Sequence, residues 1–140
     1  MNIESDHRLD VFFYGLFMDE ALLLAKGLNP QNPRLAEVAN YRLVIGERAT
    51  LIPSLGGAAY GLLFSLTKGE IDRLYSEASV SIYQPQNVQA KLANGEIVTA
   101  LCFNLPKPPS ASERNSEYAT RLKALAERLG LPRDYVETIS

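Results

Sequence analysis

The chain has 140 residues, a formal net charge of −2 and one cysteine, and 46% of its residues are hydrophobic. This length suits one domain with one core. No run of Lys or Arg occurs, so nothing electrostatic indicates a nucleic-acid partner. Because Cys102 and His7 are the only residues of their types, an internal disulfide and a typical zinc site are excluded.

The N-terminal segment, residues 1–10, is polar and lacks the apolar core of a signal peptide. The apolar segment that follows, 11–24, contains Asp19 and Glu20 and is too short and too polar to cross a bilayer. We therefore expect a flexible leader over residues 1–10, a single domain over 11–140, a cytoplasmic location and no membrane partner.

The first predicted elements are a strand and a short helix. Residues 11–15 (VFFYG) are β-branched or aromatic and end in glycine, a pattern typical of a buried strand. Asp19 is a suitable N-cap and Gly27 a suitable C-cap glycine, so residues 20–26 predict a helix.

The next segment predicts a loop and three strands. Two prolines and two asparagines indicate a loop over residues 29–33. Gly56 and Gly57 predict a turn between the second and third strands. The three strands are expected over residues 34–46, 48–53 and 58–66.

The second half of the chain opens with two strong local signals. Thr67 and Glu70 have the spacing of a capping box, which predicts the start of a short helix. Asn94-Gly95 lies between alternating apolar runs, so residues 88–104 predict a β-hairpin.

The C-terminal segment predicts helices. Gly130 and Pro132 are stop signals, and a last short helix is expected over residues 132–139. Consecutive strands joined by turns favour an α+β fold, a mostly antiparallel β-barrel with a few flanking helices, over a doubly wound parallel sheet. The preceding helix is predicted by apolar residues at helical spacing: Tyr118, Leu122, Leu125 and Leu129.

Several segments, taken together and in order, resemble the γ-glutamylcyclotransferase-like (avirulence-induced-gene-like) family, over about residues 11–139. The resemblance implies a closed or nearly closed β-barrel with external helices. It implies an intramolecular reaction, in which the α-amino group of a γ-glutamyl substrate attacks its own γ-amide. The products are 5-oxoproline and an amine, and no cofactor or metal is needed. The segments are FFYGLFMDEALL, YRLVIGERATLIPSLGGAAYGLLFSLTKGEIDRL, IDRLYSEASVSIYQP and SEYATRLKALAERLGLPRDYVETI.

The resemblance implies that Glu77 is the general acid/base, because it matches the acidic position of the family and Tyr83 follows six residues later. Such a role requires burial beside apolar or aromatic groups. The alternative is an ordinary solvated glutamate, one of 16 acidic residues. Tyr83 could line the pocket or simply belong to a strand.

The substrate cradle implied by the resemblance is the loop Tyr14, Gly15, Leu16 and Phe17. A strand that ends in glycine can turn sharply and present backbone N–H groups to a carboxylate or an oxyanion. Tyr118 matches a family tyrosine whose hydroxyl reaches the substrate, although core packing alone would also explain it.

Other polar residues leave alternatives open. Arg42 and Arg48 could each pair with a substrate carboxylate or form surface ion pairs. Cys102 alternates with core positions and fits inert packing. No Ser–His–Asp or Cys–His arrangement can be assembled, because His7 lies in the polar leader.

Two positions depart from the family pattern. Leu16 replaces a small hydroxyl residue, and Ala78 replaces a glycine after the acidic residue. An inactive module of the same fold that binds a small molecule or a protein is therefore the alternative to an enzyme. The sequence does not fix the oligomeric state.

Overall fold

The computed structural model describes residues 7–140, and its centre is a closed five-stranded barrel with strand order β1-β3-β2-β4-β5. Neighbouring strands are antiparallel, except that β1 and β5 are parallel where they close the barrel. With the flanking helices, this confirms the predicted α+β fold with a mostly antiparallel barrel. The strands are β1 (Arg8–Phe13), β2 (Gln31–Ile45), β3 (Ala49–Thr67), β4 (Gln84–Leu92) and β5 (Ile97–Asn104).

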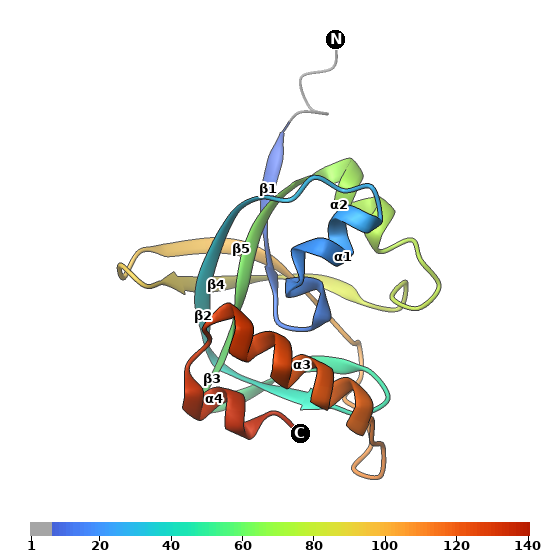
Figure 1. Cartoon of the computed structure of the whole chain (residues 1–140), viewed down its shortest axis with the longest axis vertical. Helices are drawn as coiled ribbons and strands as arrows, with labels where there is room; N and C mark the ends of the chain where they lie inside the picture. Colours follow the sequence, from blue (N-terminus) through green and yellow to red (C-terminus); the bar gives the residue numbers. More distant parts are fainter. Residues whose placement is uncertain (1–6) are drawn as a thin grey trace.

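The helices form two groups outside the barrel (Figure 1). Helices α1 and α2 lie near one end, and α3 and α4 lie near the other. The predicted caps are confirmed: Asp19 accepts a hydrogen bond of 3.1 Å from the N–H of Ala21, and Thr67 and Glu70 form a capping box. The helices are the 3-10 helix η2 (Leu16–Met18), α1 (Glu20–Ala25), α2 (Lys68–Leu74), α3 (Ser116–Leu129) and α4 (Arg133–Thr138).

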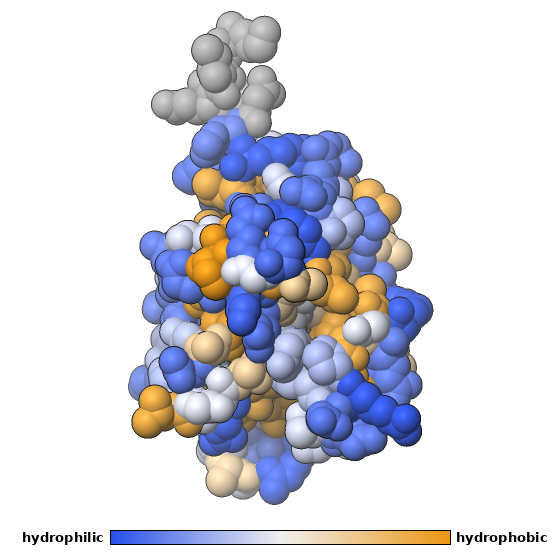
Figure 2. Space-filling view, turned by 90° about the vertical axis from the view of Figure 1, so that its left-hand side faces the viewer, coloured by the Kyte–Doolittle hydropathy of each residue, from blue (hydrophilic) through white to orange (hydrophobic). Residues whose placement is uncertain are grey.

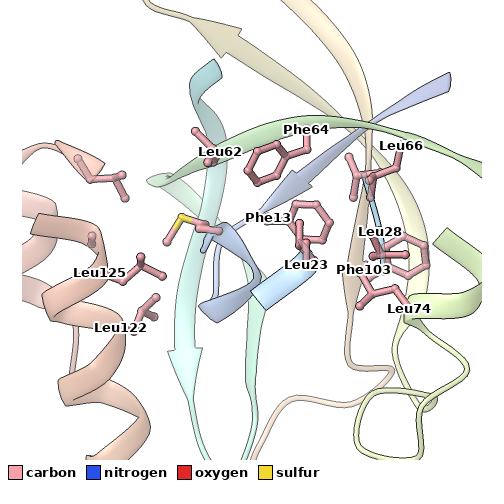
Figure 3. Close-up of a cluster of buried hydrophobic side chains, with 14 of the residues drawn as sticks. Phe13, Leu23, Leu28, Leu62, Phe64, Leu66, Leu74, Phe103, Leu122 and Leu125 are labelled. Carbon is pink, nitrogen blue, oxygen red and sulfur yellow. The ribbon is translucent and has the colours of Figure 1, made fainter. Parts of the chain in front are cut away.

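The second half of strand β1, Val11 to Phe13, is buried on both faces, as the apolar sequence from Val11 onward predicts. Phe12 belongs to the cluster that fills the barrel, whereas Val11 and Phe13 belong to a second cluster between the barrel and the helices. Figure 3 shows Phe13 near Phe64 and Leu23 in this second cluster. Strand β1 therefore joins the two parts of the core.

The β2–β3 hairpin differs from the sequence prediction. The strands expected over 48–53 and 58–66 form one continuous strand, β3. Gly56 has φ +80°, and its N–H donates to the Asn40 side chain at 3.1 Å. A register shift lies beside Asn40, which also has a positive φ. The paired glycines therefore accommodate an irregularity in a long hairpin and do not reverse the chain.

Two chain segments predicted to be irregular belong to strands. Strand β1 begins at Arg8, so residues 8–10 of the expected leader are part of the barrel. The Arg8 guanidinium donates to the Ser65 carbonyl at 2.8 Å. Residues 1–6 of that leader lie outside the described residues. Strand β2 begins at Gln31, inside the expected loop 29–33.

The surface carries apolar residues among polar ones. On the face drawn in Figure 2, hydrophilic and hydrophobic residues are interspersed. Within residues 7–140, no helix has both the length and the apolar character that crossing a membrane requires.

Glu70 is a buried carboxylate that connects three parts of the fold. It accepts a hydrogen bond of 2.9 Å from the N–H of Thr67 and another from the N–H of Asn29, and the Arg8 guanidinium lies 3.7 Å away. Burial alone would raise its pKa, but the two N–H donors and the Arg8 charge together lower the pKa below its usual value.

We expect the substitution Glu70→Gln to lower the free energy of unfolding by about 1–3 kcal/mol at pH 7, because one amide N–H would face a buried donor. The ionised carboxylate stabilises the fold above its unfolded-state pKa of ~4.3, and this contribution is lost as the pH falls through the lower folded-state value. Urea unfolding between pH 3 and 7 should therefore show a difference between wild type and variant that narrows at acidic pH. A difference that stays constant over this range would contradict the prediction.

Candidate active site

A cavity of about 650 Å³ opens where β1 ends, beside the start of α3. Its volume is in the range of pockets that hold small molecules. Most of its wall is aromatic or aliphatic, with polar side chains among them. The lining residues are Phe12, Phe13, Tyr14, Gly15, Leu16, Phe17, Leu22, Lys26, Glu47, Arg48, Ala49, Tyr75, Ser79, Val80, Tyr83, Phe103, Asn115, Tyr118 and Arg121.

The aromatic wall is held by stacking and by hydrogen bonds to the backbone. The rings of Tyr75 and Phe103 are stacked, with centroids 3.8 Å apart. Tyr14 Oη donates to the Phe103 carbonyl at 2.7 Å, and Tyr83 Oη donates to the Ala49 carbonyl. Burial raises the pKa of Tyr14, Tyr75 and Tyr83, so these hydroxyls stay protonated at neutral pH.

Two buried polar side chains hold the strands that carry this wall. Asn104 Oδ1 accepts a hydrogen bond of 3.1 Å from the N–H of Leu51, and Thr50 Oγ1 accepts one of 3.0 Å from the N–H of Leu105. These bonds join β3 to the end of β5. They fix the parts of β3 and β5 that contain the Ala49 and Phe103 carbonyls, which accept the hydrogen bonds from Tyr83 and Tyr14.

The loop after β1 is in close contact with Tyr118 of α3. The Leu16 N–H donates to Tyr118 Oη at 3.3 Å, and a Cβ atom at Gly15 would lie 2.5 Å from the same oxygen. A side chain at position 15 would therefore displace the Tyr118 hydroxyl or the loop. Asn115, the N-cap of α3, accepts a hydrogen bond of 3.0 Å from the Tyr118 N–H and so fixes the start of the helix.

Glu77 lies at the edge of the cavity, in the loop between α2 and β4. Lys26 Nζ is 2.8 Å from both of its carboxylate oxygens, and the same ammonium lies 5.8 Å from the centre of the Phe17 ring. Lys26 lines the cavity, whereas Glu77 does not. The Glu77 side chain is 37% exposed, so the apolar enclosure expected from its proposed role is absent in this arrangement.

The structure brings most of the predicted site residues together. Six of them line this same cavity. Glu77 does not line it, but it forms an ion pair with Lys26, which does. Ala78 is not strained: among the described residues, the only positive φ angles outside glycine are at Asn32 and Asn40. The six lining residues are Tyr14, Gly15, Leu16, Phe17, Tyr83 and Tyr118.

Other lining residues were not singled out by the sequence. Lys26 follows the short helix α1 and carries no signal in the sequence that separates it from a surface lysine. Arg121 follows Tyr118 by three residues, and one turn of helix places it at the same cavity. Of the two arginines considered as carboxylate partners, Arg48 lines the cavity and Arg42 does not.

The described residues bring no group of three His, Cys, Asp or Glu side chains close enough to hold a metal ion. Cys102 is fully buried inside the barrel, and burial raises the pKa of its thiol to about 12. Its thiol is therefore protonated and packed, not a nucleophile.

Comparison with family models identifies the chain. Residues 11–121 match the model described as gamma-glutamyl cyclotransferase, AIG2-like. This match spans more than half of the chain, so the protein belongs to that family. The comparison with curated proteins gives no match.

Solved structures share the fold at low sequence identity. A protein named gamma-glutamyl cyclotransferase aligns with a TM-score of 0.81 and 18% identity over 95% of this chain and 86% of its own. An uncharacterized protein from Homo sapiens aligns with a TM-score of 0.77 and 19% identity, over 94% of this chain and 86% of its own. YkqA from Bacillus subtilis aligns with a TM-score of 0.79 and 23% identity, over 96% of this chain but only 53% of its own.

The close contact at Gly15 leads to a prediction about stability. We expect Gly15→Ala to lower the free energy of unfolding by about 1–3 kcal/mol, because its methyl group would collide with Tyr118 Oη. In Tyr118→Phe the nearest remaining ring atom would be 3.8 Å away, an ordinary contact. The double variant should therefore lose less than the sum of the two single variants. Additive losses in urea unfolding would show that the loop does not depend on this contact.

Proposed function

We propose that this protein is a cofactor-independent enzyme that cyclises a γ-glutamyl amine, amino acid or peptide. The α-amino nitrogen of the substrate attacks its own γ-carbonyl carbon and forms the C–N bond of 5-oxoproline. The amide bond to the leaving nitrogen then breaks, and that nitrogen departs as an amine after gaining a proton. Membership of the cyclotransferase family supports this proposal.

The observation that carries the proposal is that the loop after β1 and Tyr118 of α3, which are far apart in the sequence, form one wall of a single cavity. An intramolecular ring closure depends mainly on holding one molecule in a folded conformation. Well-held reactions of this kind can gain about 7–11 kcal/mol from orientation. The aromatic wall, with its hydroxyls bonded to the backbone, is rigid enough to hold a substrate in this way.

Tyr118 is suited to stabilise charge on the substrate. Its oxygen accepts a hydrogen bond from the Leu16 N–H, so its own proton is free to donate. Burial raises the pKa of Tyr118, which keeps that proton in place. In the proposed reaction it donates to the γ-carbonyl oxygen, on which negative charge develops as the ring closes.

Glu77 is proposed to move the proton. It takes a proton from the substrate's α-ammonium group and returns it to the leaving nitrogen. In the structure, the Glu77 carboxylate already binds an ammonium group, that of Lys26, whose Nζ lies 2.8 Å from both carboxylate oxygens. A substrate ammonium has the same charge and donors, so substrate binding would require it to replace Lys26 on at least one oxygen.

The same ion pair favours a second candidate function. With both oxygens of Glu77 bound by Lys26 and the side chain outside the cavity wall, the pocket could bind a small molecule without cyclising it. In this alternative the protein has the same fold and the same cavity but does not catalyse the cyclisation.

The purified protein should release 5-oxoproline, detected by NMR, from at least one member of a panel of γ-glutamyl amines, amino acids and peptides. We expect Glu77→Gln to lower the rate by about 10²–10⁴-fold, the usual contribution of general acid/base catalysis. Asp72→Asn, an exposed carboxylate on α2 that does not line the cavity, is the matched control and should keep the wild-type rate.

Circular dichroism should show the same folded spectrum for both variants. Absence of 5-oxoproline from every panel member, combined with measurable ligand binding, would favour the binding module. Full activity in Glu77→Gln would show that Glu77 does not transfer the proton.

A further inference from the structure

The loop that carries Glu77, residues 77–83 between α2 and β4, consists of two successive turns. The Val80 N–H donates to the Glu77 carbonyl at 3.0 Å, and the Tyr83 N–H donates to the Val80 carbonyl at 3.1 Å. Three side-chain contacts join this loop to other parts of the described chain. They are the hydrogen bonds of Lys26 to Glu77, of Arg48 to the Ser79 carbonyl and of Tyr83 to the Ala49 carbonyl.

The contact with Lys26 is the one that the proposed reaction breaks. A substrate ammonium group replaces Lys26 on the Glu77 carboxylate, so at that moment the position of Glu77 depends on its backbone. Of the two remaining contacts, the one on Ser79 is nearer, because Ser79 lies inside the turn that the Val80 N–H closes on Glu77. The backbone of Glu77 is therefore held mainly through Ser79 when Lys26 is displaced.

The turn between β2 and β3, residues 46–48, contacts both parts of the proposed site. On one side, Arg48 Nε donates to the Ser79 carbonyl at 3.1 Å. On the other side, Asn115 Nδ2 donates to the Glu47 carbonyl at 3.1 Å, and Asn115 is also the N-cap of α3. This turn therefore connects the loop of the proposed general acid/base to the helix of the proposed hydrogen-bond donor.

The segment after β5 packs closely against this turn. Glu113 Oε1 accepts a hydrogen bond of 3.1 Å from the Glu47 N–H. A Cβ atom at Gly46 would lie 2.4 Å from Pro109 Cβ, so the two backbones approach as closely as glycine allows. Arg48 therefore extends toward Ser79 from a well-packed support.

The charge of Arg48 is balanced by a neighbouring acid. Backbone N–H donors are the main cause that lowers the pKa of Glu113, and the Arg48 charge lowers it further. The Glu113 carboxylate is therefore ionised at neutral pH beside the guanidinium. The feature that connects Arg48 to the proposed site is its hydrogen bond to Ser79, not an unbalanced charge.

We propose that Arg48 is a positioning residue, whose Nε–H holds the Ser79 carbonyl and so fixes the backbone of Glu77 while the Glu77 side chain exchanges Lys26 for the substrate ammonium. This inference rests on the proposed cyclotransferase function and assigns Arg48 no contact with the substrate. Because an intramolecular reaction depends on orientation, loss of this contact should lower kcat more than it raises KM.

Two substitutions separate the hydrogen bond from the charge. In Arg48→Gln the amide nitrogen occupies the same position along the side chain as Nε, so a donor remains and the charge is lost. Arg48→Met has a similar length and no donor. The measurement is kcat and KM for 5-oxoproline release from the panel member that wild type turns over fastest.

We expect Arg48→Met to lower kcat by about three- to tenfold with KM within about twofold of wild type, a moderate effect because the side chain is exposed. Arg48→Gln should keep kcat within about twofold of wild type, because its donor can still reach Ser79. Arg42→Met, at an exposed arginine of β2 outside the cavity, is the matched control and should change neither constant.

Amide hydrogen exchange measured by NMR tests the same contact without turnover. The Val80 N–H, which closes the turn on Glu77, should exchange about three- to tenfold faster in Arg48→Met than in wild type or Arg48→Gln. The N–H of Leu122, a buried residue of α3, should exchange equally in all three proteins. Faster exchange at Leu122 as well would indicate a general loss of stability and would contradict a local role.

Three further results would overturn the inference and leave the enzyme intact. One is an equal loss of kcat in Arg48→Met and Arg48→Gln, which would assign the effect to the charge. Another is a raised KM with unchanged kcat, which would place the guanidinium on the substrate. The third is unchanged exchange at Val80 in Arg48→Met. If no panel member is turned over, the proposed function fails, and exchange at Val80 alone decides whether Arg48 holds the turn.

Discussion

Burial of β1 on both faces is the constraint on which the rest of the structure depends. One face completes the interior of the barrel, and the other packs against the helices. Because Phe12 and Phe13 lie on opposite faces, neither face of this part of the strand can turn to solvent without exposing a large aromatic side chain. The loop from Tyr14 to Phe17 leaves this fixed strand, so the location of the cavity follows from the packing of the core.

The cavity is completed by elements that reach this loop from elsewhere in the chain. Tyr118 arrives on α3, whose start is fixed by Asn115, and its hydroxyl contacts the loop at Leu16. Tyr83 and Tyr14 are fixed through backbone carbonyls of β3 and β5. The Tyr14 and Tyr83 hydroxyls donate to backbone carbonyls and so fix this wall, whereas the Tyr118 hydroxyl accepts a hydrogen bond and keeps the proton that the proposed intramolecular acyl transfer requires.

Local signals predicted much of the fold, and the misses have physical causes. The Thr67 cap and the Asn94-Gly95 hairpin depend on neighbouring residues, so they can be read from the sequence alone. The Gly56 turn was wrong because pairing with β2 continues past the glycines, and this depends on a distant strand. The cavity wall around Tyr118 was predicted through the family resemblance. The Lys26–Glu77 pair could not be predicted in this way, because it joins two segments that come together only when the chain is folded.

The most direct test of the account is a crystal structure of the protein with 5-oxoproline bound. We expect the product in the cavity beside Tyr118, with the backbone of residues 15–17 against it and the Glu77 carboxylate turned from Lys26 toward the ring nitrogen. Product bound elsewhere, or bound in the cavity with Glu77 still held on Lys26 and distant from the ring, would contradict the proposed site.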